Sequence, residues 1–150
     1  MSTRCQIAVF EGSIKDKLEN QDFLAKDWRV LLYRHSDGYP EGVLPDILPF
    51  IKEFDRVRGH DTEYLGACLC AYLKYWHCGE AQKQYPHHNL KINGFEISVL
   101  SAGISKAIHW DIEFFYAIDK DNLYIFDVTL TKEDTMLFKL LSSHKITEEK

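Results

Sequence analysis

The sequence lacks the features that would mark a membrane protein or a general nucleic-acid-binding protein. No stretch approaches the roughly 18 apolar residues of a membrane-spanning helix. Lysine and arginine total 18 against 23 aspartates and glutamates, which gives a formal net charge of −5. Because non-specific affinity for duplex nucleic acid comes from clustered cations, we expect neither a duplex partner nor a membrane surface as the target.

Cysteine is scarce, and nothing at the start of the chain resembles a secretory signal. Met1-Ser-Thr-Arg-Cys-Gln6 has neither a long apolar run nor a small-residue cleavage site. Two of the four cysteines, Cys68 and Cys70, lie two apart in a helical pattern that suits packing better than nucleophilic attack. Free thiols in a reducing compartment are the simplest interpretation, so we expect a cytoplasmic protein.

The common mechanism-bearing motifs are missing as well. The chain has no phosphate-binding P-loop, no dinucleotide glycine fingerprint, no G-x-S-x-G elbow and no H-E-x-x-H pair. We therefore expect no cofactor, and no reaction follows from motifs alone.

What the sequence does have is enough apolar material for one domain. Its 150 residues are 45% hydrophobic and 13% aromatic. A chain of this length can bury a core without disulfide or metal support. We find no repeat or linker and interpret residues 1–150 as a single domain.

Apolar periodicity predicts an α+β fold. Strands are expected over 4–10, 27–34 and 95–100, with a hairpin of 109–118 and 123–130 joined by the turn 119–122. Apolar residues three and four apart predict helices from Leu44 to about Arg58 and from Asp61 or Thr62 to about Trp76. The residues 131–134 offer the start of a short C-terminal helix. Residues 11–26 read as a long connection with at most one helical turn.

This order favours a mostly antiparallel sheet of about five strands, with the two main helices packed on one face. Pro49 either kinks the first helix or moves its start later. The second helix carries a second apolar stripe that includes Tyr64 and Tyr75, so we expect most of its surface to be buried.

The most unusual stretch is the loop that runs from Arg34 to Gly42. A strand delivers Arg34 and His35 beside the start of a helix, where unpaired N–H groups favour an anion. This predicts an anion or phosphate site whose ligand-binding candidates are Arg34, His35, Asp37 and Tyr39. The alternative is that Asp37 and Gly38 only turn the chain, and that Arg34 pairs with a carboxylate such as Glu41.

A second group of polar residues is His109, Asp111 and Glu113. On a strand these alternate residues would share one face and could act as acid and base or hold a divalent metal. The alternative is an ordinary solvated sheet face. A third group has zinc-ligand residue types but no recognised ligand spacing, so we expect no metal there; its members are His77, Cys78, His87 and His88.

Three blocks of the chain together resemble a small uncharacterised family of prokaryotes and their viruses. Tyr33-Arg-His-Ser-Asp-Gly-Tyr-Pro-Glu-Gly-Val43 is similar to its YRHxDGYPEGV signature, Glu63-Tyr-Leu-Gly-Ala67 to a helix segment, and His109-Trp-Asp-Ile-Glu-Phe-Phe-Tyr116 to its HxDIExFY segment. The chain departs from the pattern at 11–26, which looks like an insertion, and at Trp110. The resemblance implies a phage, viral or prokaryotic setting, and host cytoplasm if the protein is viral, but no reaction.

These observations leave three functional hypotheses. The leading one is a small binding module that recognises a nucleotide-like or other anionic, phosphate-bearing molecule, or a host partner protein, through the loop from Arg34 to Tyr39. The alternative is a metal-assisted hydrolase or nuclease with His35 or His109 as acid–base and Asp111 and Glu113 as ligands or base. The third is a protein-only module, for example a homodimer that pairs through sheet or helix faces.

Overall fold

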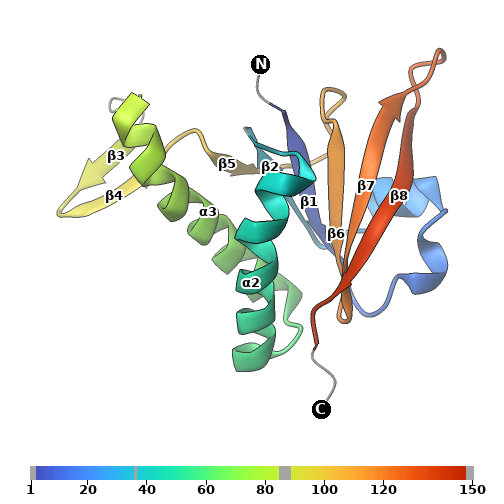
Figure 1. Ribbon diagram of the computed structural model, residues 1–150, viewed down its shortest axis with the longest axis horizontal. Coiled ribbons are helices and arrows are strands. Elements are labelled where there is room, and N and C mark those ends of the chain that lie inside the picture. Colours follow the sequence, from blue (N-terminus) through green and yellow to red (C-terminus); the bar gives the residue numbers. More distant parts are fainter. Residues whose placement is uncertain (1–2, 36, 85–88, 148–150) are drawn as a thin grey trace.

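The computed structural model describes residues 3–35, 37–84 and 89–147, without the side chains of 76–89. It confirms a mixed α+β architecture with a mostly antiparallel main sheet (Figure 1). The described helical elements are η1 (Lys15–Lys17), α1 (Gln21–Lys26), α2 (Pro40–Arg58) and α3 (Thr62–Gln84). The strands are β1 (Cys5–Val9), β2 (Val30–Arg34), β3 (Asn89–Ile92), β4 (Phe95–Ser98), β5 (Ala102–Ile104), β6 (Phe114–Ile118), β7 (Asn122–Leu130) and β8 (Met136–Lys145).

The main sheet, as far as the structure describes the chain, has six strands in the order β5-β2-β1-β6-β7-β8, and β3 and β4 form a separate hairpin. β1 runs parallel to β6, and the other neighbours are antiparallel. Cys5 is opposite both Arg34 and Phe114. The start of β1, the end of β2 and the start of β6 therefore meet at one end of the sheet.

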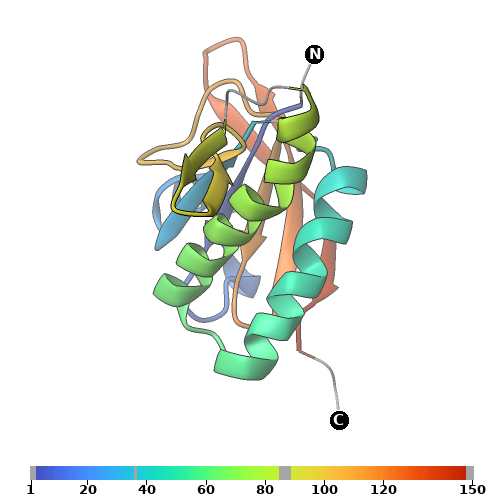
Figure 2. The same ribbon diagram turned by 90° about the vertical axis from the view of Figure 1, so that its left-hand side faces the viewer.

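Both faces of the sheet carry apolar cores. Helices α2 and α3 cover one face, here called the helix face, where Ile7, Leu32 and Tyr116 are buried (Figures 1 and 2). Segment 10–28, with α1, covers the opposite face, here called the loop face. Helices α2 and α3 lie on one face as predicted, but the main sheet has six strands rather than about five, and α1 packs on the other face. Successive residues of the central strands β1, β2 and β6 point alternately toward the two faces.

Helix α2 begins earlier than its apolar pattern indicates and runs through both internal prolines. Pro40 occupies the first turn, where its missing N–H costs nothing. Pro45 and Pro49 lie on the exposed side, while Val43, Ile47 and Ile51 are buried beneath. The carbonyls that lose a partner at each proline can bond to water, and the buried side holds the helix together.

The predicted C-terminal helix is wrong, because residues 136–145 form strand β8 on β7. The register shifts between Ile125 and Phe126 of β7, where Leu141 is the extra residue on β8. A bulge changes which face the following residues occupy. The three- and four-residue apolar spacing that imitates a helix arises because leucines lie on both faces of β8: Leu137 and Leu140, on opposite faces, are 44% and 41% exposed.

The predicted hairpin of 109–118 and 123–130 is confirmed in its second half and wrong in its first. The β6–β7 turn is held by buried Asp119, whose carboxylate accepts bonds from the backbone N–H groups of Asp121 and Asn122. The strand starts only at Phe114, however, and residues 109–113 form an irregular turn. His109, Asp111 and Glu113 therefore do not alternate along one strand face.

Candidate functional site

Arg34 lies inside the protein rather than on the surface of its loop. It points into the helix face, where its side chain is 2% exposed and its Nη2 lies 2.9 Å from Oδ2 of Asp46 on α2. Its carboxylate partner is therefore Asp46, one helical turn beyond Glu41. Beside it, burial raises the pKa of the Cys5 thiol to about 12, although the Arg34 charge acts in the opposite direction. This is a structural ion pair that ties β2 to α2.

Gly38 anchors the same loop to the sheet. Its N–H donates to the carbonyl of Thr3 at 2.9 Å, and its own carbonyl accepts a 2.6 Å bond from the buried hydroxyl of Tyr116. A Cβ at this position would lie 2.8 Å from the Thr3 oxygen, a distance that side chains do not tolerate. Glycine is thus needed here for the close approach of two backbones.

Asp37 and Tyr39 are the exposed part of the loop. Asp37 has a φ of 54°, which an aspartate tolerates better than most residues. The Tyr39 hydroxyl donates to Oδ1 of Asp37 at 3.3 Å, and the Asp37 charge raises the pKa of Tyr39. Tyr39 also precedes the first residue of α2. The pair closes the turn before the helix.

Residues on the loop face come together around Tyr33. The ring of Tyr33 stacks on the imidazole of His109, with centroids 4.5 Å apart and planes 19° from parallel. His35, the residue after the end of β2, tilts against the same ring at 6.3 Å. Burial, and then the carboxylate of Asp111, raise the pKa of Tyr33, so that its phenol stays neutral. Two imidazoles therefore flank one neutral aromatic ring.

Arg4 and Asp111 complete this group. Arg4 Nη1 donates to Oδ2 of Asp111 at 3.2 Å, and Oδ1 of Asp111 lies 3.9 Å from Nδ1 of His109. Arg4 Nε and Asp111 Oδ1 are both buried without a hydrogen-bond partner among the described residues. Their side chains remain 40% and 24% exposed. Polar atoms left in this state are costly unless water or a ligand satisfies them.

Gln6 holds the turn that carries His109. It is fully buried in β1, its Nε2 donates to the carbonyl of Ala107 at 3.1 Å, and its Oε1 accepts the N–H of His109 at 2.8 Å. We call Arg4, Tyr33, His35, His109 and Asp111 the imidazole surface. Arg4, Gln6 and Tyr33 were not among the sequence candidates; a glutamine inside the apolar run 5–10 was the available signal.

The sequence candidates thus divide between two places. His35, His109 and Asp111 meet on the loop face, whereas Arg34 lies on the helix face with Asp46. Glu113 is exposed, and its backbone N–H bonds to the carbonyl of Arg4. Within the described residues no group of three or more His, Cys, Asp or Glu side chains is arranged to hold a metal ion. His77, Cys78, His87 and His88 lie outside the residues whose side chains are described.

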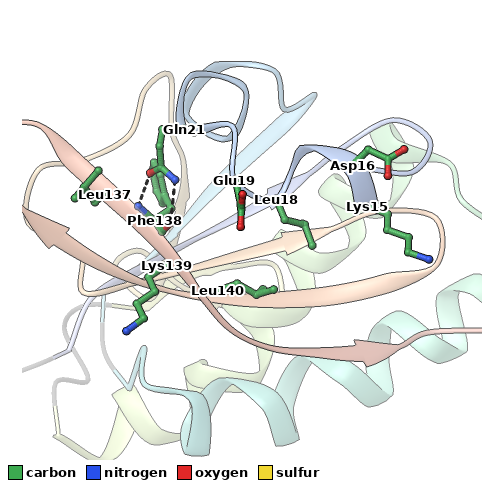
Figure 3. A pocket seen from close by; sticks show the side chains of 9 residues that line it. All are labelled: Lys15, Asp16, Leu18, Glu19, Gln21, Leu137, Phe138, Lys139 and Leu140. Atoms are coloured by element: carbon green, nitrogen blue, oxygen red, sulfur yellow. Dashed lines mark hydrogen bonds between the residues drawn. The ribbon is translucent and has the colours of Figure 1, made fainter.

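A groove of about 700 Å³ lies elsewhere, between segment 15–21 and β8 (Figure 3). The amide of Gln21 spans it, donating to the carbonyl of Phe138 at 3.0 Å and accepting the N–H of Phe138 at 2.6 Å. These bonds occupy backbone groups on the outer edge of β8. The groove is lined by charges of both signs, from Lys15, Asp16, Glu19 and Lys139. None of its lining residues belongs to the imidazole surface.

Comparison with protein-family models, curated proteins and solved structures finds no match in any of the three. In the part of the chain that is described, no helix is both long and apolar enough to cross a membrane. The resemblance to the prokaryotic and viral family therefore stays a prediction, and the function has to be argued from the geometry.

Proposed function

We propose that the protein is a small binding module whose imidazole surface recognises a flat, anionic, nucleotide-like molecule. The observation that carries this proposal is the Tyr33–His109 stack beside Arg4, at a partly exposed end of the sheet. Aromatic and imidazole rings offer stacking surfaces for a base, and an arginine offers directed donors for a phosphate.

The charges around the stack support an anion more than a cation. Arg4 carries a permanent charge, and its Nε has no hydrogen-bond partner among the described residues. His35 is exposed, so a ring N–H of its imidazole can donate a hydrogen bond to a phosphate. Asp111 bonds to Arg4 through Nη1 at 3.2 Å, and the Arg4 side chain is still 40% exposed, so other N–H groups of the guanidinium remain as donors for a ligand. Trp110, which is 77% exposed, adds a second flat ring next to His109 in the chain.

The ligand class therefore stays the one that the leading hypothesis from the sequence predicts, but the residues proposed to bind the ligand are different. Arg34, already paired with Asp46, becomes a support for the loop, and Arg4 takes its place as the cation. A host partner protein is the other ligand class that the sequence left open. The stacked pair and the Arg4 guanidinium, whose side chain is 40% exposed, favour the small molecule.

Thermal shift with adenosine and guanosine monophosphates, cyclic dinucleotides and inorganic phosphate tests this proposal. A ligand at one hundred times its dissociation constant adds about 2.7 kcal/mol of stability, which is readily seen. We expect stabilisation of wild type that is lost in His109→Ala and Arg4→Ala. His144→Ala, which removes a histidine on β8, should bind normally. Absence of binding by wild type, or equal binding by all variants, would contradict the proposal.

The pair formed by His109 and Asp111 supports a second candidate, a metal-free acid–base reaction on such a ligand. Asp111 Oδ1 lies 3.9 Å from Nδ1 of His109, so a small movement on ligand binding would form a hydrogen bond that orients the imidazole and leaves Nε2 to exchange a proton with the bound molecule. Metal assistance has no support from the donor set described here. We expect wild type to form product in the presence of a chelator. His109→Ala should abolish this activity, and His144→Ala should retain it. Binding without any turnover would leave the module non-catalytic.

A further inference from the structure

Helix α3 exposes an apolar stripe that its sequence pattern predicts to be buried. Tyr64 and Tyr75 are 56% and 74% exposed, and the small residues between them on the same side are exposed as well: Ala67, Cys68 and Ala71. Leu65, Leu69 and Leu73 occupy the opposite side and are buried against the sheet. The expectation that most of α3 is covered is therefore wrong for the single chain, since none of the elements that the structure describes lies over this side.

The β3–β4 hairpin next to α3 also turns an apolar face to solvent. Its register places Ile92 opposite Phe95, and Leu90 shares their face. These three side chains are 58%, 57% and 48% exposed. The other face is polar, with Lys91 3.8 Å from Glu96. Figure 2 shows the hairpin beside the upper part of α3, on the same side of the molecule.

We infer that this surface pairs two copies of the chain through antiparallel α3 helices. The α3–hairpin surface comprises Tyr64, Ala67, Cys68, Ala71, Tyr75, Leu90, Ile92 and Phe95. Along the helix, Tyr64, Cys68, Ala71 and Tyr75 are separated by four, three and four positions, so the spacing reads the same in both directions. A two-fold axis between Leu69 and Cys70 would set Tyr64 against Tyr75 of the partner subunit. Cys68 would then meet Ala71 of the partner subunit.

Charge complementarity favours a second copy of the chain as the partner of this surface. Between Thr62 and Tyr75 the helix has two charged residues, Glu63 near its start and Lys74 near its end. They lie eleven positions apart and so share one flank of the helix. In the antiparallel pair, Glu63 of one copy lies on the same side as Lys74 of the partner subunit, whose Nζ also donates to the Ser98 carbonyl of its own chain at 3.1 Å. A parallel pair would place the two charges on opposite flanks, where they do not meet.

The size of the surface also fits a dimer. Each of its five large apolar side chains exposes on the order of 100 Å², which amounts to roughly 1,000 Å² over two copies. Small residues and backbone add to this, and stable interfaces begin at about 1,200 Å². Between the tyrosines, Cys68 and Ala71 let two helix backbones approach closely. Each hairpin would cover apolar surface of the other copy, which suits an element that is marginal alone.

Mass measurement by light scattering at 5–100 μM tests the pairing. We expect a mass twice the 17.5 kDa of the chain for wild type. Ala71→Glu places a charge at the centre of the surface, where the residue is exposed and the fold tolerates it, and should give a monomer with an unchanged circular dichroism spectrum. Leu130→Glu, at a 50% exposed apolar residue of β7, should stay dimeric. A monomeric wild type, or a dimeric Ala71→Glu, would overturn the proposal.

Cross-linking tests the antiparallel register. Ala71→Cys places a thiol opposite Cys68 of the partner subunit, so mild oxidation should convert this variant to a covalent dimer on a non-reducing gel. The same substitution with Cys68→Ala should cross-link much less, because the two introduced thiols would lie about one helical turn apart. Equal cross-linking with and without Cys68 would refute the register. Nucleotide binding is read separately, so the two proposals fail independently.

Discussion

At the scale of single residues, one loop carries two different roles. Neighbouring residues of β2 point to opposite faces, so Arg34 is buried on the helix face while Tyr33 lies on the loop face. His35, just after the strand, contacts Tyr33 in the imidazole surface. The sequence marks the loop as unusual, but composition alone does not tell which residues support it and which remain accessible. The ion pair to Asp46 assigns Arg34 to support.

Asp46→Ala should destabilise the fold strongly. The substitution takes the 2.9 Å partner from a buried guanidinium, and breaking a buried pair costs about 3–5 kcal/mol, with the lower end expected because Asp46 is partly exposed. Urea denaturation measures the loss. Glu53→Ala breaks the exposed pair with Arg56 and serves as the control, which should unfold like wild type. Equal stability of both variants would show that the Arg34–Asp46 pair contributes nothing.

Stability should fall in alkali through the buried thiol of Cys5. Burial raises its pKa from 9.0 to about 12, so the fold favours the neutral form. The unfolded chain releases this proton near pH 9, so the contribution is intact below pH 9 and is lost as the pH rises toward 12. Urea midpoints at pH 7, 9 and 10.5 measure the decline. The urea midpoint of Cys5→Ala should be lower than that of wild type at pH 7 and should fall less steeply as the pH rises. A fall in midpoint as steep as that of wild type would exclude Cys5 as a cause.

At the scale of elements, the edge strand β8 depends on one side chain. Gln21 bonds both outward backbone groups of Phe138, which satisfies an edge that could otherwise pair with another chain. Gln21→Ala should cost about 1–2 kcal/mol of unfolding free energy for two lost bonds and increase aggregation on heating. Denaturation and light scattering measure both. The neighbouring Glu19→Ala should match wild type, and a Gln21→Ala variant that does the same would contradict this role.

The elements also show where prediction from sequence succeeds and where it stops. The β6–β7 hairpin and the cores of α2 and α3 follow from local signals, a turn of Asp and Asn residues and apolar spacing. β8 does not, because leucines on both of its faces, such as Leu137 and Leu140, give an apolar spacing that suits a helix as well. The early start of α2 is set by Pro40 in its first turn rather than by apolar residues.

The candidate site was predictable only in part, for a related reason. His35, His109 and Asp111 are polar residues in suggestive places, and the fold brings them together. Arg4 joins them because β1 lies between β2 and β6, a pairing over long sequence distances that no local pattern encodes. Gln6 acts through the same pairing, by holding residues 107–109 from inside the sheet.

At the scale of the whole molecule, the sheet separates three surfaces. The imidazole surface lies at one end of the loop face. The groove follows β8 (Figure 3), and the α3–hairpin surface lies beyond the helix face (Figure 1). We propose the first for a nucleotide-like ligand and the third for a second copy. Ligand binding and pairing use different residues, so a dimer would carry two independent sites.

Amide and imidazole chemical shifts during titration with a nucleotide test the central claim most directly. The account predicts shifts confined to Arg4, residues 33–35 and residues 107–111, with the largest changes at His35 and His109. Residues 15–21 and 137–140 of the groove should not respond, which makes them an internal control. Shifts centred on the groove, or none with any nucleotide at millimolar concentration, would contradict the assignment of ligand binding to the imidazole surface.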